Sequence, residues 1–178
     1  MKHMKLKLIV LTVLMTASAF AQDTEFKFSK DGLTDFIVTT YNSPAKDLYK
    51  RALDWVKENK DYKVMSSVEN EKITFQGVKE NFLCSKAGGT TVCSNATYTI
   101  EITFKEGKYK FAVTDIVLKD INGKVAKPNL DNFSEYYDKD GNVKKYLSDA
   151  PASYEGLFNG LNKSLVTYMD KKKKAENW

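Results

Sequence analysis

The chain has 178 residues, of which 28 are lysine or arginine, 23 are aspartate or glutamate, two are cysteine and one is histidine. That length suits a single domain with one hydrophobic core. Glycine-rich motifs of the forms GxGxxG and GxxxxGK do not occur in it, which excludes the common phosphate-binding loops.

The first 21 residues have the order of a secretory signal peptide. Basic residues precede an apolar run from Leu8 to about Met15, and small residues then lead to Ala21. The run is about half of the roughly 20 apolar residues that a membrane span needs. We therefore expect cleavage between Ala21 and Gln22 and no membrane span in the mature chain. Because no cysteine follows the run, we expect an exported protein, periplasmic or secreted, without a lipid anchor.

Removal of residues 1–21 changes the charge of the chain. Three lysines and His3 leave with the segment, so 25 basic residues face 23 acidic ones, a net charge of +2. Four of the positive charges are Lys171–Lys174, in a basic tail at residues 171–178 that follows a single domain at residues 22–170. Such a tail is more typical of a solvated chain end than of a site for anionic lipid or acidic polymer. The high isoelectric point of the full sequence is therefore no evidence for a nucleic-acid partner.

The mature chain expected after cleavage contains no histidine, which excludes several classes of catalytic and metal site. Ser-His-Asp and Cys-His nucleophilic sites and histidine-ligated zinc all need a side chain that the mature chain lacks. Carboxylate, tyrosine or lysine chemistry remains open to an enzyme, but the acidic residues show no distinctive pairing. We therefore assign no catalytic, cofactor-binding or metal-binding residue, and expect no cofactor.

The first regular elements are a strand at residues 35–41 and a helix directly after it. β-Branched and aromatic residues favour the strand. Ser43 suits the N-cap of the helix and Pro44 its first position. The opposite face of the helix carries charged residues, including Arg51, which we expect in solvent, whereas Trp55 at its edge is expected in the core. Apolar residues recur at helical spacing at Ala45, Leu48, Tyr49, Ala52 and Val56.

Strands are next expected at residues 62–69 and 71–78, followed by a hairpin at residues 98–118 with a turn at Glu106-Gly107. This pattern predicts an antiparallel sheet with one buried and one solvated face. The solvated face lacks interleaved aromatic and arginine residues, so we expect no nucleic-acid partner. Pairing outward from the turn places on the buried face Phe104 with Tyr109, Ile102 with Phe111, and Ile100 with Val113. The solvated face receives Thr103 with Lys110, Glu101 with Ala112, and Thr99 with Thr114.

The two cysteines lie between these strands, in the stretch CSKAGGTTVC from Cys84 to Cys93. Eight residues separate them, whereas a CxxC redox motif has two. A zinc site would need further ligands that the mature chain does not offer. If Gly88-Gly89 form a two-residue turn, Cys84 faces Cys93 at a non-hydrogen-bonded position, where Cα atoms lie about 4.5 Å apart. Disulfides span about 4.4 to 6.8 Å, so we expect a structural disulfide rather than a free or redox-active pair.

Residues 119–150 are expected to be irregular, with turn signals at Asn122-Gly123, Pro128 and Asp140-Gly141. The stretch DKDGN at residues 138–142 lacks the glycine and glutamate spacing of a calcium loop, and predicts a plain turn. Four aromatic residues of this segment are expected to fold back onto the domain: Phe133, Tyr136, Tyr137 and Tyr146.

A second helix is predicted from about Pro151. Gly156 and Gly160 on this helix predict close packing against a neighbour. Its apolar face is formed by Tyr154, Phe158, Leu161, Leu165 and Tyr168.

Three stretches of the sequence resemble the family called domain of unknown function 4468: DLYKRALDWV at residues 47–56, ENEKITFQG at 69–77 and YTIEITFKEGKYKFAVTDI at 98–116. The order of elements is similar from about residue 33 to residue 169. The resemblance implies a TBP-like fold and occurrence in exported proteins of Gram-negative bacteria. It does not extend to the cysteine loop or to residues 119–150. It implies no activity and no catalytic motif, and a TBP-like fold does not by itself imply DNA binding.

The whole sequence predicts an α+β, TBP-like domain: a curved antiparallel sheet of about five strands with two helices packed on one face, in the order β-α-β-β-β-β-α. We expect an exported noncatalytic envelope protein that binds an unidentified protein or envelope ligand. The alternative is an envelope hydrolase that uses carboxylate or tyrosine chemistry without histidine. That enzyme would need a deep pocket lined by carboxylates whose pKa values are shifted in opposite directions.

Overall fold

The computed structural model describes residues 24–176, so the expected signal peptide and its cleavage site at Ala21 and Gln22 lie outside the described residues. The described chain begins with a short hairpin of β1 (Phe28–Ser29) and β2 (Gly32–Leu33), then β3 (Phe36–Thr40) and α1 (Ala45–Glu58). Next come β4 (Tyr62–Val68), β5 (Lys72–Ala87), β6 (Thr90–Lys105) and β7 (Lys108–Asp120). The last elements are β8 (Val125–Ala126), the short 3-10 helices η1 (Ser134–Tyr136) and η2 (Lys145–Leu147), and α2 (Ala150–Glu176).

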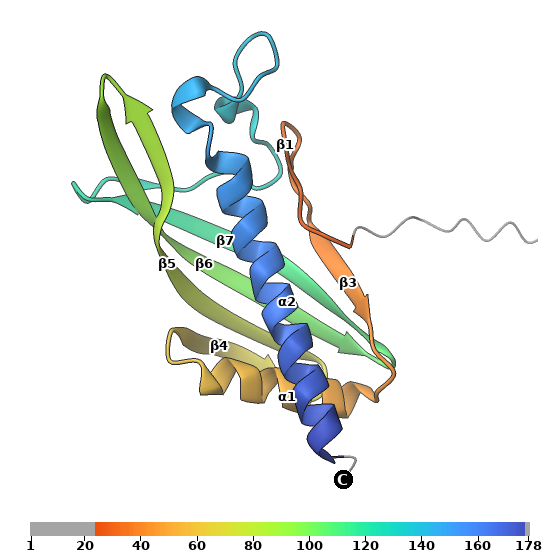
Figure 1. Ribbon diagram of the computed structural model, residues 1–178. Coiled ribbons are helices and arrows are strands. Elements are labelled where there is room, and N and C mark those ends of the chain that lie inside the picture. Colours follow the sequence, from red (N-terminus) through yellow and green to blue (C-terminus); the bar gives the residue numbers. More distant parts are fainter. Residues whose placement is uncertain (1–23, 177–178) are drawn as a thin grey trace, which may run out of the picture.

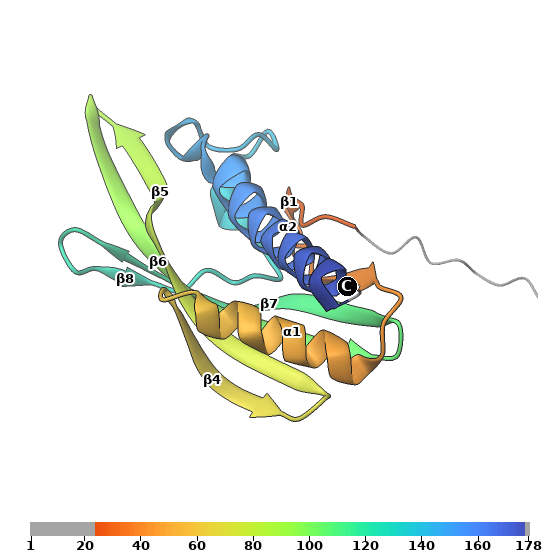
Figure 2. The same cartoon turned by 60° about the horizontal axis from the view of Figure 1, so that its bottom comes forward.

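These elements form one main sheet with both α-helices on the same face. The sheet is antiparallel with strand order β3-β7-β6-β5-β4, and β8 pairs with β7. Figure 1 shows α2 crossing the sheet obliquely, and Figure 2 shows α1 on the same side. This confirms the predicted α+β arrangement of an antiparallel sheet with two helices on one face, and β1, β2 and β8 add to the predicted order of elements. The far ends of β5 and β6 project beyond the rest of the sheet as a hairpin arm, residues 83–94 (Figure 1).

The register of β6 and β7 follows the hydrophobic alternation of the sequence. The predicted pairs next to the turn all occur, from Phe104 with Tyr109 to Ile100 with Val113. A β-bulge then shifts the register, so that Thr99 faces Asp115. The extra residue, Thr114, instead donates a side-chain hydrogen bond to the carbonyl oxygen of Thr99 at 3.3 Å. The predicted pair of Thr99 with Thr114 is therefore wrong, because alternation alone does not reveal an inserted residue.

The start of α1 differs from the prediction by one residue. Pro44 occupies the N-cap position, and the Ser43 hydroxyl instead accepts a hydrogen bond from Nη1 of Arg51 at 3.3 Å. Arg51 was expected in solvent, but only 6% of its surface is exposed, and this polar contact offsets part of the cost of its burial. Trp55 lies in the core as expected, and its Nε1 donates to Oγ of Ser164 at 3.2 Å, which links α1 to α2.

The core fills the space between the sheet and the two helices. The inner face of β5 buries Ile73 and Phe75, and the inner faces of β6 and β7 bury the predicted apolar residues, among them Ile100, Ile102, Phe104, Tyr109 and Phe111. On α2 the predicted face is correct from Tyr154 to Leu165, but Met169 rather than Tyr168 completes it. The Tyr168 hydroxyl instead donates to Oε1 of Glu58 at 2.6 Å. Phe133 and Tyr136 fold back onto the core as expected, whereas Tyr146 stays exposed.

Two further features of α2 differ from the sequence analysis. The helix continues through Lys171–Lys174 to Glu176, so these lysines lie on its last turns rather than in a separate tail. A Cβ added to Gly156 or Gly160 would meet no heavy atom within 4 Å outside its own part of the helix, so the predicted close packing is wrong. No helix among residues 24–176 is both long enough and apolar enough to cross a membrane.

Candidate functional site

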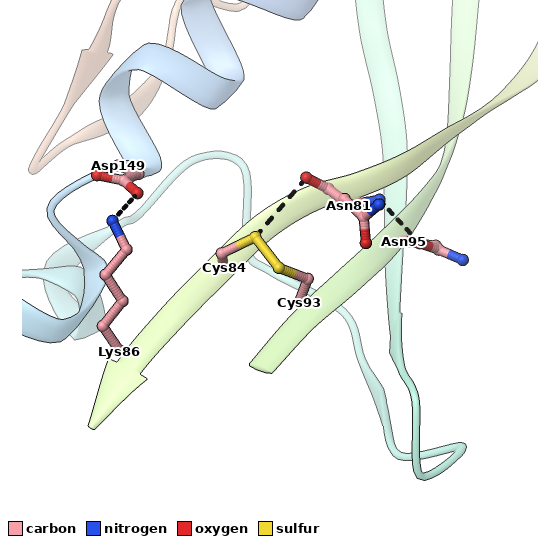
Figure 3. Close-up of a disulfide and its surroundings, with 6 residues drawn as sticks. All are labelled: Asn81, Cys84, Lys86, Cys93, Asn95 and Asp149. Carbon is pink, nitrogen blue, oxygen red and sulfur yellow. Dashed lines mark hydrogen bonds and ion pairs between the residues drawn. A yellow bond between two sulfur atoms is a disulfide. The ribbon is translucent and has the colours of Figure 1, made fainter. Parts of the chain in front are cut away.

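Cys84 and Cys93 are joined by a disulfide at the predicted pairing position in the hairpin arm. Their Cα atoms lie 4.0 Å apart. Figure 3 shows the polar contacts nearby: the Asn81 backbone N–H donates to Oδ1 of Asn95, and Nζ of Lys86 lies 2.8 Å from Oδ2 of Asp149. The ion pair ties the arm to the segment just before α2. Both cysteines of the chain are thus paired with each other in one disulfide.

A groove lies on the helix side of the sheet, between α2 and the irregular part of β5 near residues 79–83. Two adjoining hollows form it, with volumes of about 510 and 540 Å³, and both are lined by Tyr62, Lys79, Leu157 and Leu161. On the α2 side of the groove, Gly156 and Gly160 contribute no side chain. At one end of the groove, Asp61 and Glu80 contribute carboxylates. The alternative hydrolase would have to place its active site in this groove.

The tyrosines of the groove are poorly suited to that chemistry. Burial raises the pKa of both Tyr62 and Tyr98, so their phenols keep their protons at neutral pH. A tyrosine that acts as a base or nucleophile needs the opposite shift.

Within residues 24–176, no helix covers the opposite face of the sheet (Figure 2). Its residues alternate with those of the core, and many are threonine or lysine. Two ion pairs lie on it, Lys72 with Glu101 at 3.2 Å and Lys127 with Asp115 at 2.9 Å. We call this surface the uncovered face.

A hollow of about 360 Å³ lies on the uncovered face, where β3, β7 and β6 run side by side next to the β6–β7 turn. The register creates it: Val38 pairs with Lys110, Lys110 with Thr103, and Lys108 with Lys105. We call it the lysine hollow, and its lining residues are Phe36, Val38, Thr103, Lys105, Lys108, Tyr109 and Lys110. Its polar lining is therefore positively charged, with no aspartate or glutamate among these residues.

The apolar part of the lysine hollow is formed by Phe36 and Val38. Phe36 is 39% exposed, and Nζ of Lys110 lies 5.3 Å from the centre of its ring, close enough for a cation–π interaction. A smaller hollow of about 230 Å³ adjoins the lysine hollow, shares Phe36 and Lys110 with it, and is lined in part by Asp35, Glu101 and Asp131. The purely basic lining is therefore confined to the end of the sheet near the β6–β7 turn.

Metal-binding geometry is not found in the described part of the chain: no group of three or more His, Cys, Asp or Glu residues there is placed to hold an ion. In the DKDGN stretch, one carboxylate oxygen of Asp138 accepts backbone hydrogen bonds from Asp140 and Asn142, each at 2.9 Å. That carboxylate therefore closes its own turn, as expected for a plain turn.

The lysine hollow was not identified from the sequence. The alternation placed Thr103 and Lys110 on the solvated face, but it did not bring Phe36 and Val38 beside them. That step requires the pairing of β3 with β7, two strands separated along the chain by α1, β4, β5 and β6. The available signal was the density of lysine in KEGKYK at residues 105–110.

Residues 37–119 match a family model described as a domain of unknown function (DUF4468) with TBP-like fold. A solved DUF4468 family protein from Bacteroides ovatus is 14% identical, with a TM-score of 0.61 and coverage of 78% of this chain and 86% of that chain. A TBP-like protein from Parabacteroides distasonis is 13% identical, with a TM-score of 0.55 and coverage of 76% and 90%. At these identities the likeness to the two structures shows the fold alone. No curated protein matches the chain.

Proposed function

We propose that this chain, whose residues 37–119 match the DUF4468 family with the TBP-like fold, is a noncatalytic binding protein whose ligand carries negative charge and binds in the lysine hollow. The observation that carries the proposal is the lining of that hollow. Lys105, Lys108 and Lys110 surround it, and no carboxylate is among its lining residues.

The pairing of these lysines is unfavourable without a ligand. Lys105 and Lys108 sit at directly opposite positions of β6 and β7. Like charges at such positions repel one another and destabilise a sheet. An anionic group between them would replace the repulsion by attraction, and each ammonium group supplies only hydrogen-bond donors. A local arrangement that costs stability in the free protein is typical of a functional site.

The surroundings of the hollow support binding rather than catalysis. Its lining contains no serine, cysteine or histidine, and the phenol of Tyr109 lies on the other face of the sheet, where it donates to Oδ1 of Asn162 on α2 at 2.8 Å. The alternative hydrolase would need a nucleophile and a base in reach of each other. The raised pKa values of Tyr62 and Tyr98 in the groove run against tyrosine in either role.

The proposal includes export to the periplasm or the cell exterior. It is supported by the signal-peptide pattern of residues 1–21 and by the disulfide between Cys84 and Cys93, since disulfides persist in oxidising compartments. Intact mass of the protein expressed in a Gram-negative host tests it: the soluble form should begin at Gln22. A full-length species retained in membranes would overturn the export proposal.

Binding is tested by NMR titration of the mature protein with two short anions, trigalacturonate and tripolyphosphate. We expect shifts of the backbone amides of Val38, Thr103 and Lys108–Lys110. The triple variant Lys105→Gln, Lys108→Gln, Lys110→Gln should bind about tenfold more weakly, because exposed charge contacts contribute roughly 0.5 kcal/mol each.

A matched control carries the same loss of charge at the other end of β7 and beyond it: Lys119→Gln, Lys124→Gln, Lys139→Gln. These side chains are exposed, and their replacement should leave the affinity unchanged within about twofold. Equal affinities of the hollow variant and the unmodified protein would rule out the lysine hollow as the site.

A further inference from the structure

We propose that the ligand is an acidic polysaccharide, bound along a continuous basic surface that runs from the lysine hollow to the last turns of α2; this presupposes the anion binding proposed for the hollow. We call this surface the basic end. It consists of Lys105, Lys108 and Lys110 on the uncovered face and Lys171–Lys174 on α2. The inference adds a ligand class and a second contact region to the hollow.

The two groups of lysines are joined by one short stretch of chain, residues 41–43. The backbone N–H of Tyr41 donates to the carbonyl oxygen of Gly107 at 2.7 Å, and that of Gly107 donates to the carbonyl oxygen of Ser43 at 3.2 Å. The β6–β7 turn is thereby fixed against the connection from β3 to α1. Lys105 and Lys108 flank the turn residues Glu106 and Gly107, so they lie close to residues 41–43.

The last turns of α2 reach the same connection from the other side. Nζ of Lys173 donates to the carbonyl oxygen of Asn42 at 3.0 Å and lies 5.6 Å from the centre of the Tyr41 ring. The Tyr41 hydroxyl donates to Oδ1 of Asp170. Figure 1 shows the end of β3, the β6–β7 turn and the end of α2 at one end of the molecule, and Figure 2 agrees. The basic end therefore wraps from one layer of the fold to the other.

The acidic groups of this end make contacts within the protein. Oε2 of Glu106 accepts from the backbone N–H of Ala45 at 3.2 Å, at the start of α1. Asp170 accepts from Tyr41, and Oε1 of Glu58 accepts from Tyr168 and from Lys172 at 3.1 Å. Four lysines of the basic end are exposed, Lys105, Lys108, Lys171 and Lys174, and so are the carboxylates of Glu58, Glu106 and Asp170. The seven lysines against these three carboxylates leave the basic end with a net charge of +4.

The apolar part of the hollow selects among polyanions. A uronic-acid unit has an apolar C–H face beside its carboxylate, which matches Phe36 and Val38 surrounded by lysines. Polyphosphate has no apolar surface to place there. Single-stranded nucleic acid uses several successive aromatic side chains, whereas Phe36 is the one exposed aromatic residue among those that line this hollow.

The extent of the basic end selects for an extended chain. Its two groups of lysines lie on different layers, so a ligand of one or two units in the hollow does not reach α2. A polymer that contacts both gains affinity through linked contacts without any change in the hollow itself. Lysine suits such a ligand, since a compact ammonium charge does not demand the bidentate geometry that arginine offers to phosphate.

The test compares trigalacturonate with long polygalacturonate, by calorimetry on the mature protein and on the variant Lys171→Gln, Lys174→Gln. Lys172 and Lys173 are kept, because they contact Glu58 and Asn42. We expect the variant to bind the polymer about fivefold more weakly and the trimer within twofold of the unmodified protein. The matched control, Lys119→Gln with Lys124→Gln, should leave the binding of both ligands unchanged.

The outcomes separate this inference from the proposed function. Unchanged polymer affinity in the α2 variant overturns the extended basic end, while weaker trimer binding by the hollow variant still supports the hollow. Unchanged trimer binding by the hollow variant overturns the proposed function itself. Tighter binding to phosphatidylglycerol vesicles, long-chain polyphosphate or oligothymidine than to polygalacturonate overturns the assignment to a polysaccharide.

Discussion

Lys105 and Lys108 face each other across the β6–β7 turn, and this residue pair determines the character of the candidate site. Two ammonium groups at opposed strand positions repel, and no carboxylate of the hollow lies between them. Elsewhere on the uncovered face lysines have acidic partners, as in the pair of Lys72 with Glu101. The difference between these two positions is the reason for placing an anionic ligand at one of them.

Phe111 and Thr103 lie on opposite faces of the sheet, and their replacement tests the register. Phe111 is fully buried, with its ring centre 6.1 Å from that of Phe26. Phe111→Ala should lower the free energy of unfolding by about 3 to 5 kcal/mol, because it leaves a cavity. Thr103→Ala should change it by less than about 0.5 kcal/mol. Urea titrations measure both, and similar small effects would contradict the register.

Gly160 provides a second residue-scale prediction. It lies inside α2 with open space where a Cβ would be, so alanine should fit without a clash and restrict the unfolded chain. Gly160→Ala should therefore raise the free energy of unfolding by about 0.5 to 1 kcal/mol.

A contrasting glycine gives the control for that variant. A Cβ at Gly77 would lie 2.4 Å from the hydroxyl oxygen of the buried Tyr98, so Gly77→Ala should destabilise the protein. Thermal unfolding of both variants gives the comparison. A lower melting temperature for Gly160→Ala would mean that the helix packs against something at this position after all.

At the scale of elements, the hairpin arm projects beyond the rest of the sheet (Figure 1). Its disulfide closes a loop of about ten residues, for which the chain-entropy model gives roughly 2 to 3 kcal/mol. The ion pair of Lys86 with Asp149 joins the arm to the segment before α2, but both side chains are largely exposed and the pair contributes little. The arm therefore depends mainly on the disulfide and on β-sheet pairing.

The double variant Cys84→Ala, Cys93→Ala should still fold, because the main core lies outside the arm. Its melting temperature should fall, in keeping with the loss of roughly 2 to 3 kcal/mol. Binding of trigalacturonate should not change, since the lysine hollow lies near the opposite end of β6. Circular dichroism melting and the NMR titration check both statements. Loss of the folded state on mutation would show that the arm is needed for the core to form.

At the scale of the whole molecule, the two faces of the sheet differ in what packs against them. Both helices and most aromatic side chains are on one side, where they form the core (Figure 2). The other side is left to threonine, lysine and a few exposed apolar residues. The uncovered face is therefore accessible to a ligand. On the helix side, the hydroxyl groups of Tyr98, Tyr109 and Tyr154 are buried in the core.

The buried tyrosines predict a loss of stability at high pH. Burial raises the pKa of Tyr109 to about 12, and burial also raises the pKa of Tyr98 and Tyr154. In the unfolded chain these pKa values return to about 10. The folded state therefore holds the protons more tightly, so its stability is complete below pH 10 and falls as the pH rises from 10 to 12.

For Tyr109 alone, this loss amounts to about 3 kcal/mol over that interval. Denaturant titrations at several pH values measure the fall, and phenolate absorbance follows the ionisation of the tyrosines. The variant Tyr109→Phe should show a shallower dependence. Stability that stays constant from pH 10 to pH 12 would contradict the burial of these hydroxyls.

Much of the sheet was predictable because its strands are neighbours along the chain. In the hairpins of β5 with β6 and of β6 with β7, a turn sets the register and each residue meets a partner a few positions away in sequence. The facing positions of Cys84 and Cys93 and of Phe104 and Tyr109 follow from counting outward from those turns. The helical spacing of apolar residues likewise identified α1 and α2, whereas the TBP-like fold was implied by the resemblance of three stretches to the DUF4468 family.

Only the tertiary structure decided the features that depend on distant segments or on local departures from regular pairing. The bulge at Thr99 adds a residue that alternation does not reveal, and the burial of Arg51 depends on its surroundings in the fold. The lysine hollow needs β3 beside β7, and the basic end needs α2 beside residues 41–43. The sequence by itself determined the local patterns, because turns and periodicity act between near neighbours. Packing decided which of these patterns meet, since that choice depends on how the whole core is filled.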